Sequence, residues 1–166
     1  AALGNLFGVD TEVTLTDLEV SGSIPDYLDG RYLRNGPNPI GEIDPELYHW
    51  FIGDGMVHGV RLADGKAQWY RNRFVQTPNV TGDSGDVMAN MGDLTRGTGN
   101  THVMRHRDKI LCLEEGHWPW QIDDELNTLG YVNFDGKLTT SLTAHPKVCP
   151  ATGELLGTKV TDEPAR

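Results

Sequence analysis

Glycine and proline occur so often in this chain that they limit the length of every regular element. The 166 residues include 20 glycines and 9 prolines. Both residue types interrupt regular structure, because glycine is too flexible and proline has no amide hydrogen to donate. Turn signals recur after about ten residues, a spacing typical of short strands. The best helical candidate, residues 123–126, is too short for a stable helix. The sequence therefore predicts an all-β fold.

A first hairpin can be placed from its turn residues. Residues 56–62 and 67–75 are rich in β-branched and aromatic side chains, and they flank Asp64 and Gly65. An Asp-Gly pair between two apolar segments is a strong signal for a two-residue hairpin turn. We therefore expect these two segments to pair as antiparallel strands.

Further strands are expected later in the chain. Residues 101–104 and 109–113 form a second candidate pair around residues 107–108, and a third strand is expected over residues 131–134. Between residues 77 and 99 the sequence is rich in glycine and aspartate, with only scattered apolar residues. This segment is expected to be a long loop, and loops of that length are usually functional or disordered.

Charge and composition exclude several classes of protein. The 14 basic and 24 acidic residues give a net charge of −10, which would repel the phosphate backbone of nucleic acids. The longest apolar run, residues 110–113, is far shorter than the roughly 20 residues that cross a bilayer, and no leader sequence is recognisable. Cys112 and Cys149 lack the spacing of a zinc knuckle. We expect a soluble, cytoplasmic protein with reduced thiols and no nucleic-acid partner.

Several motifs in order along the chain resemble one known family. They are GSIPDYLDGRYLRNGPNP (22–39), HWFIGDGMVHGV (49–60), WYRNRFV (69–75), NTHV (100–103) and TAHPK (143–147). Together they resemble the amino-terminal part of the carotenoid cleavage oxygenases, the retinal pigment epithelial membrane protein family. The resemblance is strongest over residues 15–156, and after Leu156 it fades. It implies that residues 1–166 are one partial oxygenase domain, a fragment of a longer chain.

The resemblance carries expectations about fold and chemistry. It implies a seven-bladed β-propeller, of which this chain holds the amino-terminal blades without closing the ring. It also implies a non-haem Fe(II) centre held by four histidines, which cleaves a double bond of a carotenoid or apocarotenoid with O₂. Imidazole suits ferrous iron, and open coordination positions would let O₂ bind beside the apolar polyene substrate.

Two residues match functional positions of the family. His145 corresponds to the first iron ligand in chain order, and the other three ligands would lie beyond this chain. Glu115 corresponds to a carboxylate that orients a later iron-bound histidine, because a carboxylate that accepts the far imidazole N–H fixes the tautomer of the ligand. The alternatives are that His145 is an ordinary core or surface histidine with its own hydrogen-bond partners, and that Glu115 is a solvated glutamate beside a glycine turn.

Glu114, the residue before Glu115, bears on which class of substrate the protein cleaves. Relatives that cleave phenolic stilbenes are expected to carry a basic residue near position 114, where this chain has Glu114. A cation can hold a phenolate, so a glutamate favours a carotenoid or apocarotenoid. Family members often extract substrate from bilayers through an apolar patch, so the sequence leaves peripheral membrane contact open. It also leaves the oligomeric state open.

Two other interpretations remain open from the sequence. The fragment can be a catalytically silent partial propeller that binds an apolar ligand or a partner chain through its open sheet edges. Alternatively, His102, His106 and Glu115 can hold zinc in a metallohydrolase, although two histidines four apart would share one face only on a helix, and this segment is predicted as strand. His49 and His58 are expected to make structural hydrogen bonds.

Overall fold

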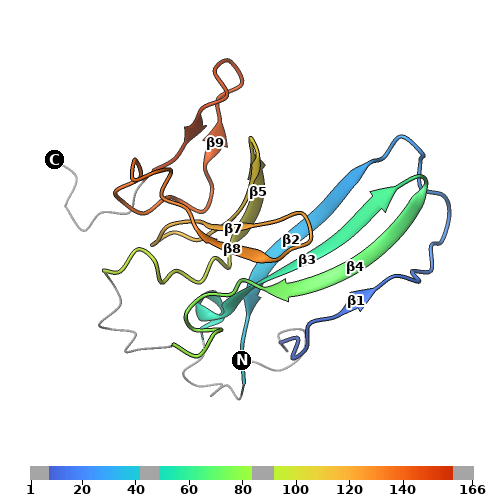
Figure 1. The fold of residues 1–166 in the computed structure, drawn as a ribbon, viewed down its shortest axis with the longest axis horizontal. Helices are drawn as coiled ribbons and strands as arrows, with labels where there is room; N and C mark the ends of the chain where they lie inside the picture. The colour runs from blue at the N-terminus through green and yellow to red at the C-terminus, as the bar shows by residue number, and fades with distance from the viewer. Residues whose placement is uncertain (1–7, 42–48, 84–91, 159–166) are drawn as a thin grey trace.

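The computed structural model describes residues 8–41, 49–83 and 92–158. Within these ranges the regular structure is almost entirely antiparallel β-strand, as the sequence predicted (Figure 1). The elements in chain order are β1 (Thr14–Leu15), β2 (Gly30–Asn38), the 3-10 helix η1 (Trp50–Ile52), β3 (Asp54–Ala63), β4 (Lys66–Phe74), β5 (His102–His106), β6 (Lys109–Leu113), β7 (Trp120–Ile122), β8 (Thr128–Tyr131), β9 (Lys147–Val148) and β10 (Leu155–Leu156).

The first sheet has four strands in the order β1-β4-β3-β2. Its central hairpin, β3 and β4, confirms the first predicted strand pair. Asp64 and Gly65 have φ angles of 52° and 67°, and positive φ at both central residues is what a type I′ turn requires. This turn matches the right-handed twist of the flanking strands and sets the pairs nearest to it, Ala63 with Lys66 and Leu62 with Ala67. A β-bulge between Arg61 and Leu62 then shifts the register of the rest of the hairpin.

The second sheet has four strands in the order β5-β6-β7-β8. The hairpin of β5 and β6 confirms the second predicted pair, with Arg107 at a positive φ of 52° in its turn. The strand expected over residues 131–134 is wrong in position, because β8 ends at Tyr131. Phe134 and Asp135 have φ angles of 52° and 59°, and this left-handed backbone turns the chain away from the sheet.

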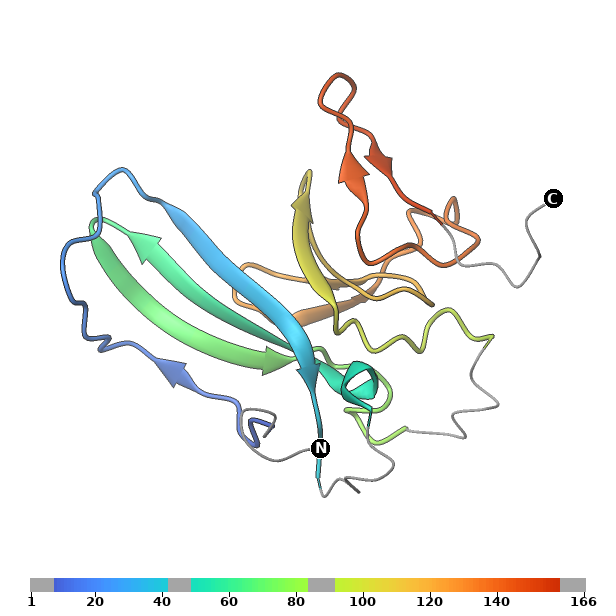
Figure 2. The ribbon, with the colours of Figure 1, turned by 180° about the vertical axis from the view of Figure 1, so that it is seen from behind.

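A small hairpin follows the second sheet. Strands β9 and β10 pair with each other and project beyond the rest of the fold, at the red end of the chain in Figures 1 and 2. Its turn is closed by the Cys149 amide, which donates to the Glu154 carbonyl at 2.8 Å. This hairpin begins directly after Pro146, so it continues the segment that carries His145.

Strand β6 lies at the centre of the core because both of its faces are buried. Side chains alternate across a strand: Ile110 and Cys112 pack into one hydrophobic cluster, whereas Leu111 and Leu113 pack into a second. The first cluster joins the two four-stranded sheets, with Val57, Trp69 and Val75 from one side and Ile110, Cys112, Trp120, Ile122 and Leu126 from the other. The second cluster contains Leu111, Leu113, Val132, Leu142 and Ala144.

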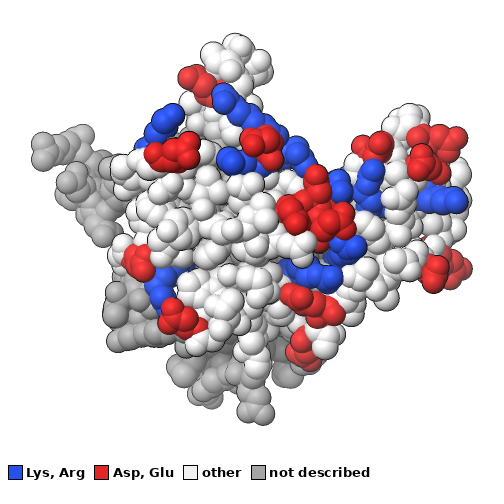
Figure 3. All heavy atoms as spheres, in the orientation of Figure 1, with Lys and Arg blue, Asp and Glu red and all other residues white. Residues whose placement is uncertain are grey.

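Ion pairs at the turn between β7 and β8 also join the two sheets. Asp124 pairs with Arg105 of β5 at 2.6 Å and with Arg31 of β2 at 3.4 Å. Glu125 pairs with Arg71 of β4 and with Arg31 at 3.6 Å. On the face drawn in Figure 3, basic and acidic residues are interspersed rather than gathered into one basic area. Arg31, Arg71 and Arg105 thus help to hold the two sheets together.

The described residues form fewer sheets than the chain length would allow. Blades of about 40–50 residues would leave room for three to four, but the described ranges contain two four-stranded sheets and one hairpin. The reason is that residues 75–83 and 92–101 contain no strand, in agreement with the predicted loop, of which residues 84–91 lie outside the described ranges. No helix in the described ranges is long and apolar enough to span a bilayer.

Candidate metal-ligand site around His145

The residues on either side of His145 are buried, while its imidazole is exposed. Ala144 is fully buried in the second cluster and Pro146 is also buried. A residue before proline is restricted to extended conformations, which limits the backbone of His145. Its amide donates to the Thr143 hydroxyl oxygen at 3.3 Å. The side chain of His145 is nevertheless 64% exposed, so this corner presents an imidazole from a fixed position.

A second imidazole lies against His145. The ring of His102, at the start of β5, stacks on the His145 ring with 5.9 Å between centroids and 28° between planes. The Nδ1 atom of His102 lies 2.8 Å from the Ala144 carbonyl oxygen. A carbonyl oxygen only accepts hydrogen bonds, so Nδ1 carries the proton and donates. In neutral His102 the unprotonated nitrogen is therefore Nε2.

Glu115 lies near the free edge of His145. Its Oε1 is 4.0 Å from His145 Nε2, and the two side chains are 50% and 64% exposed. This distance is too long for a hydrogen bond, and an ion pair this exposed contributes little to stability. The carboxylate therefore retains its capacity to accept a hydrogen bond from another group. The predicted roles of Glu115 and His145 stay predictions, but the structure brings the two side chains together.

Glu114, in contrast, is fully engaged. Its Oε1 lies 2.5 Å from His117 Nδ1, and its Oε2 accepts the Gly116 amide at 3.0 Å. This hydrogen bond raises the pKa of His117; partial burial opposes the rise, and the charges of Glu114 and Asp93 reinforce it. His117 is thus stabilised as the cation. Its contact with Glu114 closes the turn of residues 114–117 that follows β6 and contains Glu115.

The loop before β5 packs closely against this pair. A Cβ atom at Gly97 would lie 2.6 Å from the Cβ of His117, so only glycine allows the backbone this close. The Gly97 carbonyl accepts the indole N–H of buried Trp120 at 2.8 Å, and the Leu94 carbonyl accepts the Trp118 amide at 2.9 Å. The segment from 92 to 99 therefore supports the loop that carries Glu114 and Glu115.

The zinc interpretation is not supported by the arrangement of the histidines. His102 and His106 stand at the two ends of the five-residue strand β5, and a strand rises about 3.3 Å per residue. In the part of the chain that the structure describes, no group of three or more His, Cys, Asp or Glu side chains comes close enough to hold a metal ion. His102, His106 and Glu115 therefore do not converge as a zinc site would require.

The remaining histidines have structural partners, as expected. His58 Nδ1 lies 2.8 Å from the Tyr70 hydroxyl across the β3–β4 hairpin, and His49 accepts the Phe51 amide at 3.4 Å. Desolvation, assisted by the charge of Arg34, lowers the pKa of His58. A neutral His58 fits a role within the sheet.

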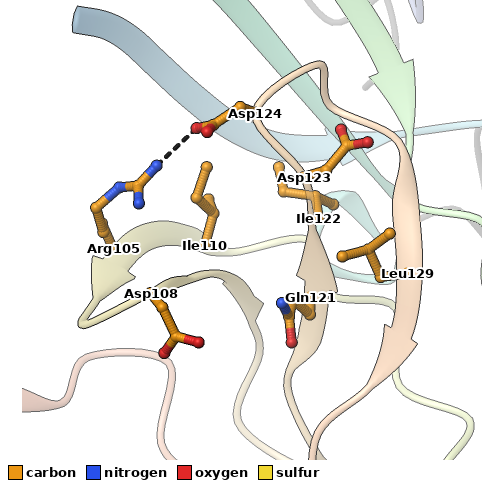
Figure 4. Close-up of a pocket in the computed structure, with 8 residues that line it drawn as sticks. All are labelled: Arg105, Asp108, Ile110, Gln121, Ile122, Asp123, Asp124 and Leu129. Carbon is orange, nitrogen blue, oxygen red and sulfur yellow. Dashed lines mark hydrogen bonds and ion pairs between the residues drawn. The ribbon is translucent and has the colours of Figure 1, made fainter.

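A pocket lies between β5, β6 and β7 (Figure 4). Two of its acidic side chains, Asp123 and Asp124, hold structural contacts. Asp124 pairs with Arg105 at 2.6 Å, and Asp123 Oδ1 accepts the amides of Glu125 and Asn127 at 2.8 Å each. These contacts hold the turn between β7 and β8, so the pocket does not compete with His145 as a reactive centre.

Sequence reasoning missed the stacking of His102 on His145 and the ion pair of His117 with Glu114. The first joins residues 43 positions apart (145 − 102), and no local pattern signals it. The second joins residues three apart outside any helix, where spacing alone does not predict a contact. Both depend on how the loops fold back onto the second sheet.

The family to which this all-β chain belongs is shown by its similarity to known proteins. The family model of the retinal pigment epithelial membrane protein matches residues 6–165. This chain therefore belongs to that family, which is the family of the carotenoid cleavage oxygenases.

Individual relatives agree with this assignment. The carotenoid cleavage oxygenase of Mycobacterium tuberculosis is 52% identical over an alignment of 157 positions that covers 92% of this chain and 31% of the relative. The carotenoid 9,10(9',10')-cleavage dioxygenase 1 of Pisum sativum is 39% identical over an alignment of 186 positions that covers 92% of this chain and 34% of the plant protein. Among solved structures, the lignostilbene dioxygenase of Pseudomonas brassicacearum superposes with a TM-score of 0.73 at 34% identity, over 90% of this chain and 34% of that chain. The chain thus spans about a third of the length of these relatives.

Proposed function

We propose that the protein carrying this chain is a non-haem Fe(II)-dependent dioxygenase that cleaves a double bond of a carotenoid or apocarotenoid. The observation that carries the proposal is His145, an exposed imidazole on a rigid corner in a chain that is 52% identical to a carotenoid cleavage oxygenase. In this proposal the two four-stranded sheets are the first blades of a seven-bladed propeller, and the rest of the ring comes from further chain.

The residues present fit one part of an iron centre. His145 offers an exposed imidazole whose Nε2 lies 4.0 Å from the Glu115 carboxylate, and imidazole is a suitable ligand for ferrous iron. The described residues supply no three-ligand group, so the remaining ligands belong to further chain. Iron, when bound, would supply the coordination of O₂ next to the polyene.

Glu115 has a separate role in this proposal. Its carboxylate has free acceptor capacity beside His145, so it can accept the N–H of a histidine contributed by the rest of the propeller. Such a contact would fix the tautomer and orientation of that second ligand. The long 4.0 Å separation from His145 leaves Glu115 available for this partner.

Glu114 supports the carotenoid branch over the stilbene branch. Its carboxylate is occupied by the His117 cation and the Gly116 amide, so the pair carries no net positive charge that could hold a phenolate. A hydrocarbon polyene makes no such demand.

The test is carried out on the full-length protein. We expect one Fe(II) per protein, together with O₂ consumption and loss of polyene absorbance on incubation with an apocarotenal. His145→Ala should lower iron affinity and activity by at least about 100-fold, and Glu115→Gln by about 10–100-fold. His106→Ala is the control, because it removes a histidine of β5 that has no role in the proposed iron centre.

Two results would contradict the proposal. Full iron binding and activity in His145→Ala would show that His145 is not a ligand. Cleavage of a hydroxystilbene by the unmodified protein, without cleavage of carotenoids or apocarotenals, would refute the substrate class and the argument from Glu114.

A further inference from the structure

The backbone of His102 is held by hydrogen bonds from both four-stranded sheets. It begins β5 and stands opposite Leu113 in the ladder with β6. The side-chain amide of Asn35, from β2 of the other sheet, donates to the His102 carbonyl at 3.2 Å and to the Gly99 carbonyl at 2.7 Å. The His102 backbone is therefore tied to both sheets, and its ring starts from a fixed point.

The ring of His102 then makes two contacts with the same short segment. Its Nδ1–H donates to the carbonyl of Ala144, which is fully buried, and its face stacks on the ring of His145. A buried carbonyl needs a hydrogen-bond partner, and here the donor is a side chain rather than a strand. One imidazole thereby fixes the peptide before His145 and covers one face of the His145 ring.

We propose that His102 is a positioning residue for the iron ligand His145. This inference rests on the proposed function for the role of the iron, but the contacts on which it is based belong to the metal-free chain. Stacking restricts rotation of the His145 ring, and the hydrogen bond to Ala144 fixes the backbone that carries it. The ligand is then already oriented before metal binds, which lowers the entropy that metal binding must remove.

The two contacts of His102 can be separated by substitution. His102→Asn keeps a side-chain N–H that can donate to the Ala144 carbonyl but removes the aromatic face. His102→Phe keeps a flat ring for stacking but removes the donor and leaves the buried carbonyl without its partner. His102→Ala removes both contacts. His106→Ala, at the other end of the same strand, is the matched control.

The first readout is Fe(II) affinity of the full-length protein, measured by competition with a chelator. We expect His102→Ala to weaken binding by about 10-fold at unchanged stoichiometry, as is typical for loss of a group that orients a ligand. His102→Asn and His102→Phe should each recover part of that loss, whereas His106→Ala should bind like the unmodified protein. A merely structural role of His102 would lower thermal stability without this pattern of partial rescue.

The second readout uses the metal-free full-length protein labelled with ¹⁵N-histidine. In the unmodified protein we expect His102 as the Nδ1–H tautomer, and a change in the His145 ring resonances in His102→Ala that is smaller in His102→Phe. This measurement does not involve iron. If the unmodified protein binds no iron, the proposed function fails, and the resonances alone decide whether His102 orients His145.

Two outcomes would overturn the inference. If His102→Ala matches His106→Ala in iron affinity and leaves the His145 resonances unchanged, His102 does not position the ligand. If His102→Ala abolishes iron binding altogether and none of the variants restores it, His102 is itself a ligand through Nε2 and the positioning role is wrong.

Discussion

Replacing His117 by glutamine should destabilise the protein near pH 5.5, and by less as the pH rises. The Nδ1 of His117 lies 2.5 Å from Glu114 Oε1, and the two side chains are 24% and 16% exposed. A hydrogen bond between charged groups contributes about 1.5–3 kcal/mol. Because solvent partly screens this pair, we take the lower part of that range, about 1.5–2 kcal/mol.

The sign of the pH dependence follows from the direction of the pKa change. The hydrogen bond to Glu114 raises the pKa of His117 above its ordinary value of 6.5, so the folded protein holds this proton more tightly than the unfolded chain does. The resulting stabilisation is fully present below pH 6.5 and is lost as the pH rises through the folded-state pKa. Carboxylates ordinarily stay ionised above about pH 5.5, so the effect in this window belongs to the histidine.

The assay is urea denaturation of the unmodified protein, His117→Gln, Glu114→Gln and the double variant, from about pH 5.5 to pH 9. The double-mutant cycle isolates the interaction between the two side chains. Hydrogen exchange at the Gly116 amide, which donates to Glu114, gives a local measure of the same loop. A stability difference between unmodified protein and His117→Gln that is constant or grows with pH would refute the reasoning, as would a coupling energy near zero.

The other predictions concern packing. Leu111 is 0% exposed in the cluster that also contains Ala144, so Leu111→Ala should lower the free energy of unfolding by about 2–5 kcal/mol. Leu129 lies in the same sheet but is 61% exposed, so Leu129→Ala should change the free energy of unfolding by less than about 0.5 kcal/mol. Equal effects of the two substitutions in urea denaturation would contradict this core assignment. At Gly55, a Cβ would lie 2.6 Å from the backbone carbonyl oxygens of residues 98–99. Gly55→Ala should therefore lower the melting temperature through about 1–3 kcal/mol of strain, while Gly30→Ala, where no atom lies within 4 Å, should not; similar melting temperatures for both would refute the close approach.

Local chemistry made part of this fold predictable. The turn of the β3–β4 hairpin follows from Asp64 and Gly65, because both residues tolerate a positive φ. The buried strand β6 appears in the sequence as a short continuous apolar run, residues 110–113. The strand expected over residues 131–134 is wrong in position, because β8 ends at Tyr131. The positive φ of Phe134 is not evident from its residue type, since aromatic residues rarely adopt it.

The sequence by itself determined the all-β class and two hairpins, because turn sterics and strand alternation act over a few neighbouring residues. Proline at position 146 also restricts the backbone at the corner that carries His145. Only the tertiary structure decided which side chains surround that corner. His102 reaches His145 because the segment after β8 folds back across β6. Ala144 of this segment is buried against Leu111 and Leu113 of β6, and its carbonyl accepts the hydrogen bond from His102. The His117–Glu114 pair likewise closes only when the loop at Gly97 packs against it. Contacts of this kind depend on long-range burial of apolar surface, which no local residue pattern specifies.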